Sequence, residues 1–186
     1  VSGTLGLANV NDQGGTAIYT AINMGDVNVT AGADSDLFGL TGNVTIDYYH
    51  SNSAANGYDR LDWTTAFADG ALLNPGSYLP TPVDLTIDFT SDMDYRVAGS
   101  VTGTGTNGAF LTVGGVVLSG SAEFALSRYD RDIGTVTGGT LDTWAFNVNE
   151  AGVAVDNLTL TVSGTLGLAN VNDQGGTAIY TAINMG

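Results

Sequence analysis

Apolar and polar residues alternate without a slip along one segment of this chain. In DNLTLTVSGTLGLA, residues 156–169, the even positions from 158 to 168 are apolar apart from one glycine, and the odd positions from 157 to 167 are polar apart from one glycine. Successive side chains of a β-strand point to opposite faces, so this period of two predicts a long strand with one apolar face. The apolar positions are Leu158, Leu160, Val162, Leu166 and Leu168.

Shorter segments with β-forming patterns cover most of the remaining sequence. Strands are predicted at residues 16–23, 26–30, 43–49, 83–89, 95–106, 109–118, 122–129, 134–141 and 143–149. The chain contains 27 glycines and three prolines, and turn signals recur at intervals of roughly ten residues. The pattern predicts an all-β fold, either a β-sandwich or a jelly roll. Residues 51–60 and 68–80 are predicted as surface connections.

The first 25 residues, VSGTLGLANVNDQGGTAIYTAINMG, recur letter for letter as residues 162–186, an offset of 161 residues from residue 1 to residue 162. Three explanations are open: a tandem array, a neighbouring subunit's segment joined to this chain, or an engineered duplication. A tandem array is the simplest explanation. It predicts one unit at residues 1–161 and the start of the next unit at residues 162–186.

The boundary between these units falls inside the long predicted strand. No linker rich in proline, serine or glycine separates the units, so a flexible string of domains is not expected. Units that share a strand should form a stiff rod, as in donor-strand complementation. The alternative is that Gly164 divides the segment into two short strands. The residues expected to form the inter-unit strand are Leu158, Leu160, Val162, Leu166, Leu168, Val1, Leu5 and Leu7.

The chain is strongly acidic, with 19 acidic residues, four basic residues and a net charge of −15. This charge repels phosphate backbones and anionic lipid surfaces, so nucleic acid is not an expected partner. No apolar run is long enough for a transmembrane helix, so no membrane insertion is expected in this segment. The absence of cysteine and lysine excludes disulfides, thiolate metal sites and Schiff-base chemistry.

The motif D-x-D occurs three times, at Asp34 and Asp36, Asp92 and Asp94, and Asp130 and Asp132. In an extended segment residues i and i+2 point the same way, so the two carboxylates converge. Converging carboxylates suit calcium, which is therefore the candidate cofactor, with the first two pairs favoured. The sequence lacks an EF-hand loop and the nonapeptide repeat of calcium β-rolls. In the third pair, Arg128 and Arg131 could neutralise the acids instead.

The sequence gives no strong sign of catalysis, and we expect a protein that is not an enzyme. Its single histidine, His50, precedes a polar stretch and is predicted at a solvated strand end. There is no G-x-S-x-G motif and no carboxylate pair that stands out. Several aromatic residues could form a platform for sugars, although core packing is the favoured use. They are Tyr48, Tyr49, Tyr58, Trp63 and Trp144.

Exact repeats, strands rich in Gly, Thr, Val and Asp, no cysteine and few basic residues together resemble bacterial cell-surface adhesin and filament repeats. The segment TWAFNVNEAGVAVDNLTLTVSG, residues 143–164, is similar to secreted β-sandwich proteins of the Gram-negative exosortase-sorted type. The resemblance implies an extracellular, cell-surface structural protein whose partner is itself. The alternative is a carbohydrate-binding module of a secreted adhesin or enzyme, with surface glycans as ligands. Burial of Trp63 and Trp144 would favour the structural role.

Overall fold

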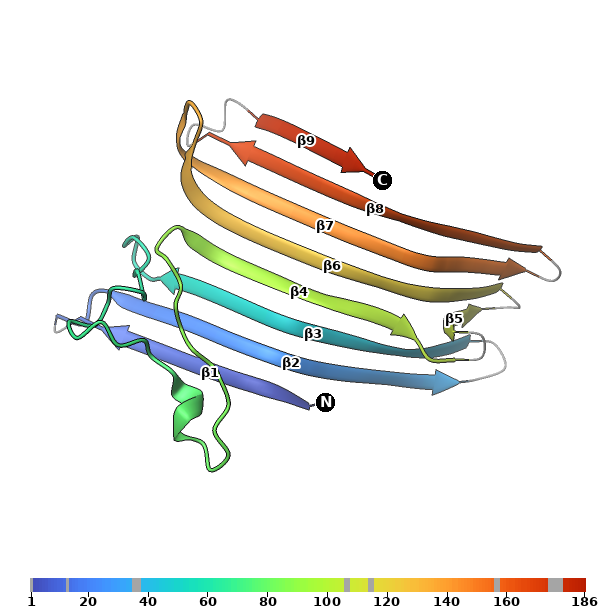
Figure 1. The fold of residues 1–186 in the computed structure, drawn as a ribbon, viewed down its shortest axis with the longest axis horizontal. Coiled ribbons are helices and arrows are strands. Elements are labelled where there is room, and N and C mark those ends of the chain that lie inside the picture. The colour runs from blue at the N-terminus through green and yellow to red at the C-terminus, as the bar shows by residue number, and fades with distance from the viewer. Residues whose placement is uncertain are drawn as a thin grey trace.

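The computed structural model describes residues 2–12, 14–34, 38–105, 108–113, 116–155, 158–173 and 179–186. Over these residues the chain forms nine antiparallel strands of one sheet (Figure 1). The elements are β1 Ser2–Asn11, β2 Ile18–Asp34, β3 Phe38–Ala54, the 3₁₀ helix η1 Pro75–Tyr78, β4 Met93–Gly103, β5 Ala109–Val113, β6 Val116–Ile133, β7 Val136–Val155, β8 Leu158–Asn172 and β9 Ile179–Met185.

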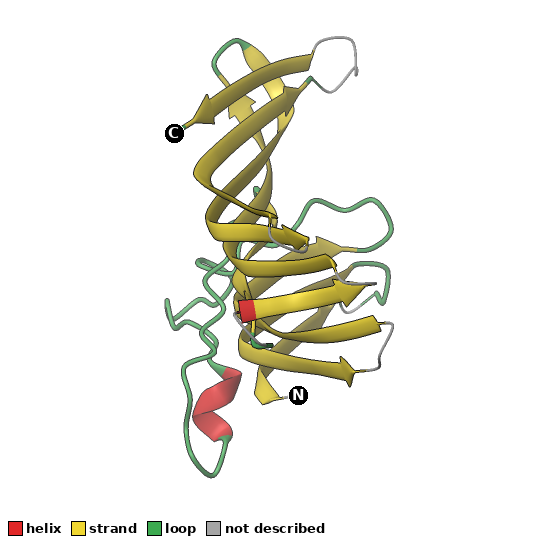
Figure 2. Ribbon diagram, turned by 90° about the vertical axis from the view of Figure 1, so that its right-hand side faces the viewer, coloured by secondary structure: helices red, strands yellow, loops and turns green. Residues whose placement is uncertain are grey.

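The strand order across the sheet is β1-β2-β3-β4-β6-β7-β8-β9, and the short β5 pairs with β3 and β6. Strands that follow each other in sequence are mostly neighbours in space, which gives a meander. Figure 2 shows the twist that β-sheets normally have. The all-β prediction is confirmed. The described residues form one open sheet, and no second sheet of described residues faces it.

The strands are longer than the turn signals suggested, because some glycines lie in bulges and not in turns. Gly120 has φ 122° and lies where the β6–β7 register shifts between Ser119 and Ser121. A glycine with positive φ can kink a strand without ending it. The strands predicted at 95–106 and 109–118 are successive in the chain but do not pair with each other, since β4 pairs with β3 and β6.

Residues 55–92, here called the strap, connect β3 to β4 and cross one face of the sheet over β1–β3 (Figures 1 and 2). The strap supplies Trp63, Ile87 and Phe89 to the buried core. These side chains pack against Ala8 and Ala21 of the β1–β2 hairpin. Burial of apolar surface is the main stabilising term in folding, so the strap holds this end of the sheet together.

A fully buried amide anchors the strap to β3. Asn52 Nδ2 donates hydrogen bonds to the carbonyl oxygens of Leu61, at 2.9 Å, and Thr90, at 3.1 Å. Its Oδ1 accepts a hydrogen bond from Trp63 Nε1 at 3.0 Å. A buried polar group is tolerated when its hydrogen bonds are made, and here one side chain fixes both ends of the strap.

The side of the sheet opposite the strap is here called the open face. One row of paired residues crosses this face from edge to edge and is apolar throughout, since paired residues lie on the same side of a sheet. The row consists of Leu5, Met24, Tyr49, Val97, Leu126, Trp144, Leu168 and Ile183.

The apolar side of β8 belongs to this open face. The alternating pattern predicted that this side would be buried, but Leu160 and Val162 are 61% and 57% exposed. Leu7 is also exposed on the corresponding face of β1. The alternation therefore predicted the strand correctly, whereas the cover for its apolar side is not part of the described chain. The side chain of Leu158 and the whole of Val1 lie outside the described residues.

Candidate functional site

The repeated sequence forms the same hairpin at opposite ends of the sheet. Residues 1–25 are here called the first copy and residues 162–186 the second copy. In the first copy Leu5 pairs with Met24, and this register continues to the end of β1. In the second copy Leu166 pairs with Met185 in the same register. The described strands of the two copies thus pair in the same register, although one pair begins the sheet and the other ends it (Figure 1).

The two copies have different neighbours. In the first copy β1 lies at the edge of the sheet, and β2 pairs with β3 from Tyr19 to Asp34. In the second copy β8 pairs with β7 along most of its length, and β9 lies at the opposite edge. Each copy therefore has the neighbour that the other copy lacks. An edge strand presents unpaired backbone groups, so both ends are suited to further strand pairing.

One continuous strand covers the segment in which the sequence predicts the unit boundary. β8 runs from Leu158 to Asn172 and passes Val162 and Gly164 without interruption. The irregularity lies in its partner β7, where the register shifts between Val148 and Ala151. The predicted alternative, two strands separated at Gly164, is not adopted. Residues 158–172 therefore form a paired strand and not a tether.

The strap covers only the first copy. Asn23 Nδ2 donates a hydrogen bond to the carbonyl oxygen of Thr86 at 2.8 Å, and Ala21 is fully buried. The counterparts of these residues in the second copy, Asn184 and Ala182, are exposed. Since the sequences are identical, the difference in burial comes from the neighbours of the first copy, which are the strap and the paired strand β3.

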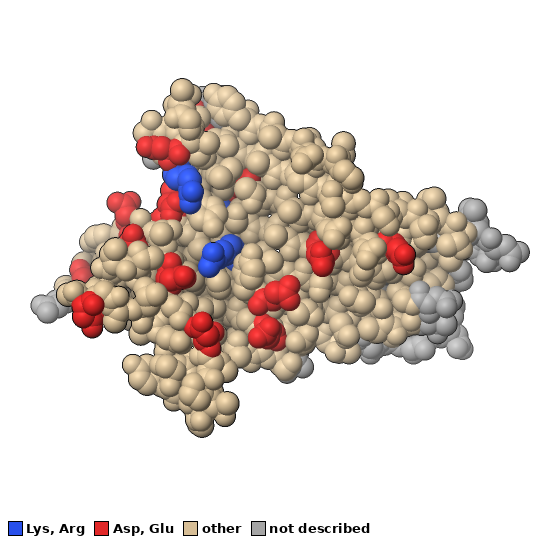
Figure 3. All heavy atoms as spheres, viewed as in Figure 1, with Lys and Arg blue, Asp and Glu red and all other residues tan. Residues whose placement is uncertain are grey.

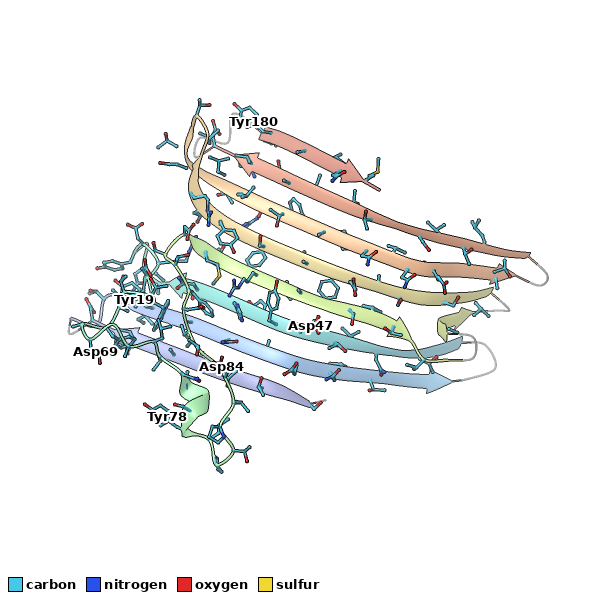
Figure 4. All side chains as sticks on the ribbon, in the orientation of Figure 1. Tyr19, Asp47, Asp69, Tyr78, Asp84 and Tyr180 are labelled. Atoms are coloured by element: carbon cyan, nitrogen blue, oxygen red, sulfur yellow. The ribbon has the colours of Figure 1, made fainter. Side chains whose placement is uncertain are left out.

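An acidic cleft of about 320 Å³ lies between the strap and the sheet. Four aspartates line it: Asp26, Asp47, Asp84 and Asp88. The Asp84 carboxylate accepts hydrogen bonds from the backbone N–H and hydroxyl of Thr86, and these bonds lower its pKa. Figure 4 shows Asp84 on the strap and Asp47 on β3. Figure 3, viewed from the strap side, shows acidic side chains spread across this face.

His50 also lines this cleft, and its predicted position was wrong. It lies within β3, because that strand continues to Ala54, and it is half-buried. Its Nδ1 accepts a hydrogen bond from Arg96 Nε at 2.6 Å, and its ring stacks on Phe89 with centroids 5.0 Å apart. Burial, reinforced by the positive charge of Arg96, lowers the pKa of His50 to about 4. The imidazole is therefore neutral at pH 7 and holds Arg96 in place.

The structure places the D-x-D residues beside arginines and turn amides. Asp92 forms an ion pair with Arg131, and Asp130 forms one with Arg60. Asp132 accepts a hydrogen bond from the backbone N–H of Gly138 at 2.7 Å.

The other D-x-D residues are described only in part. Asp94 is half-buried, the side chain of Asp34 is not described, and Asp36 lies outside the described residues. Among the residues that can be placed, no group of three or more acidic or histidine side chains is arranged to hold a metal. Calcium binding at these pairs stays a prediction.

The candidate aromatic residues do not form one platform. Trp63 is 0% exposed beneath the strap, whereas Trp144 is half-buried on the open face. Tyr58 is exposed on the strap, and its hydroxyl bonds to Thr16. Trp63 is therefore a core residue, as the favoured interpretation of the aromatics expected.

An ion pair that sequence reasoning missed joins β6 to β7. Arg128 Nε and Nη2 donate to the two carboxylate oxygens of Asp142, at 2.6 and 3.0 Å. Asp142 is buried, and the pair raises the pKa of Arg128. Proximity in the chain suggests that Arg128 could neutralise Asp130 and Asp132. Strand register, which the sequence did not reveal, gave it a different partner.

None of the protein-family models, curated proteins or solved structures compared with this chain matches it. In the part of the chain that the structure describes, there is no helix with the length and apolar character needed to cross a membrane.

Proposed function

We propose that this chain is a structural unit of an extracellular filament or of a giant repetitive surface protein. One observation carries the proposal: the same 25 residues form the same hairpin, in the same register, at both ends of a single sheet. A sheet that ends as it began can be extended by repeating the strands between the two copies.

The direction of growth follows from the strand order. β9 has the sequence of the first part of β2, which pairs with β3 on its outer side. Adding another unit would therefore place a β3-type strand beside β9 and continue the sheet across its strands. Each junction would then be a hydrogen-bonded strand pair, so a stiff rod is expected in place of a flexible chain of domains.

The open face supports the finer expectation of a sandwich built from more than one copy. Its apolar row spans the sheet. The charges of Arg128 and Asp142 on this face neutralise each other in an ion pair. A second sheet packed about 10 Å away would cover these side chains. Exposed apolar surface of this extent usually marks an interaction surface. The extracellular location follows from the resemblance of the sequence to bacterial surface repeats.

The carbohydrate-binding alternative has weaker support, because Trp63 is buried and Trp144 lies on the opposite face from the strap. No described row of exposed aromatics offers sugars a flat platform.

The deciding measurement is the mass of the native protein under denaturing conditions. A tandem array predicts a covalent species many times heavier than this 19.0 kDa chain. A species close to the mass of one unit would contradict the covalent array. Such a result would leave separate subunits joined by strand exchange as the only form of the proposal.

A further inference from the structure

We propose that β8 and β9 of the second copy form a docking site for the strap and β3 of another copy of this chain. This inference rests on the proposed function, and it names the contacts that would join two units. The occupant is defined by the first copy, in which the same residues are already covered by that strap and paired with that strand.

The contacts in the first copy are close and specific. A Cβ atom added to Gly6 would lie 3.1 Å from Leu85 Cβ, so the strap approaches the β1 backbone closely. Next to this contact, Asn23 bonds to Thr86 of the strap. The absence of a side chain at Gly6 and the amide of Asn23 therefore allow the strap to pack on the hairpin. The second copy has the same residue types at Gly167 and Asn184.

The second copy has room for the same partner. A groove of about 400 Å³ lies beside it, lined by Gly167 and Asn184, the counterparts of Gly6 and Asn23. A Cβ atom added to Gly167 would have only Asn184 atoms nearby, at 3.9 Å. Tyr180 is 55% exposed, whereas its counterpart Tyr19 packs against the strap core. Figure 4 shows Tyr19 beside the strap and Tyr180 at the far end of the sheet.

The neighbourhood of the groove also fits the strap. In the first copy η1 overhangs the sheet beyond β1 (Figure 1). At the second copy the same overhang would lie above β7, where Ala145 and, on the adjacent β6, Ala125 line the groove. Small side chains at these positions leave space for the overhanging helix.

The hairpin can be exchanged as a unit. The first copy ends at Gly25, and Asp26 has the left-handed value φ 52°, which interrupts the regular extended backbone of β2. In a single chain the first copy fills the site by virtue of its high effective concentration. When the fit of the first copy is impaired, the second copy of another molecule should replace it beneath the strap.

The experiment places the same substitution in each copy of the full 186-residue chain. Gly6→Val is expected to lower the melting temperature and to produce a concentration-dependent ladder of multiples of 19.0 kDa in light scattering. Gly167→Val is the matched control, and it should melt like the unsubstituted chain and stay monomeric. The double variant should be destabilised and form no ladder.

A cysteine pair gives a second readout, because the chain has no cysteine of its own. In the Gly6→Val background, Thr86→Cys with Asn184→Cys should form disulfides between molecules. The control pair, Thr86→Cys with Asn23→Cys in an otherwise unsubstituted chain, should form a disulfide within one molecule. Intermolecular linking no greater than that of the Asn184→Cys chain alone would overturn the proposal.

Two other results would also overturn it. A Gly6→Val chain that melts like the unsubstituted protein would show that the close contact between Gly6 and Leu85 does not determine which hairpin lies beneath the strap. A Gly6→Val chain that fails to fold at every concentration would show that the second copy cannot replace the first. Neither result depends on the mass of the native protein, so failure of this inference and failure of the covalent array are distinguishable.

Discussion

At the scale of single residues, the acidic cleft shows how neighbours decide the state of a side chain. His50 is neutral at pH 7 because it is half-buried and hydrogen-bonded to Arg96. Nothing in the local sequence IDYYHSNS indicates either property. Arg96 lies 46 residues away and reaches His50 only because β3 and β4 pair in the observed register.

The lowered pKa of His50 predicts a pH dependence of stability. The pKa is about 4 in the folded chain and 6.5 for an unperturbed histidine, so between these values the unfolded chain binds the extra proton. The free energy of unfolding should therefore fall as the pH drops from 6.5 towards 4, and His50 should contribute no slope above 6.5. The slope is at most about 1.4 kcal/mol per pH unit, and less for a half-buried group.

Urea unfolding of the wild type and His50→Gln across pH 4–7 measures this contribution. Glutamine does not titrate, and its Oε1 can still accept a hydrogen bond from Arg96. The variant should therefore be less sensitive to pH in this window. Identical pH profiles for the two chains would mean that His50 does not titrate as the structure indicates.

At the scale of elements, the strap provides the side chains that give the sheet a buried core. A sheet with both faces open buries little apolar surface, and the described core lies where the strap crosses the β1–β2 hairpin. Trp63 is central to this core, because it is fully buried and also bonds to Asn52.

Removing the Trp63 side chain should detach the strap. Trp63→Ala is expected to lower the free energy of unfolding by about 3–5 kcal/mol, the usual loss for a buried tryptophan. Trp63→Phe should lose about 1–3 kcal/mol, since it leaves Asn52 Oδ1 buried without its donor. Denaturant unfolding gives both values. Trp144→Ala is the control, and a loss as large as that of Trp63→Ala would contradict the assignment of the core.

At the scale of the whole molecule, charge and repetition act against each other. A net charge of −15 keeps copies apart, whereas the two ends of the sheet are complementary. Screening by salt shortens the range of the repulsion from about 30 Å at 10 mM to about 8 Å at physiological ionic strength. Assembly should therefore be favoured by salt, and a bound divalent cation would add to this effect.

Calcium binding at the D-x-D pairs predicts a higher melting temperature in calcium than in a chelator. Sodium chloride at equal ionic strength controls for screening, and Asp94→Asn with Asp132→Asn tests the two described pairs. Equal melting temperatures in calcium and chelator would argue against all three pairs. The ion pairs of Asp92 and Asp130 with arginines would then account for those carboxylates.

Local patterns predicted some elements correctly, whereas the strand predicted at residues 83–89 is part of the strap and has only an isolated bridge at Ile87. The alternation in residues 156–169 predicted β8, because side-chain periodicity is a property of the extended backbone itself. Strand lengths were predicted less well, since Gly120 permits either a turn or a bulge and only pairing with β7 decides between them. The partners of Arg128 and His50 could not be predicted, because they depend on register between strands.

The sequence by itself determined that this protein is all-β, that it is strongly acidic, and that one hairpin occurs twice. These properties reside in composition, periodicity and identity, and they need no knowledge of distant contacts. Only the tertiary structure decided that the two hairpins lie at opposite ends of one open sheet, and that the strap covers one and leaves the other exposed. Those facts depend on which strands pair and where a long connection crosses them, and such contacts join residues far apart in the chain.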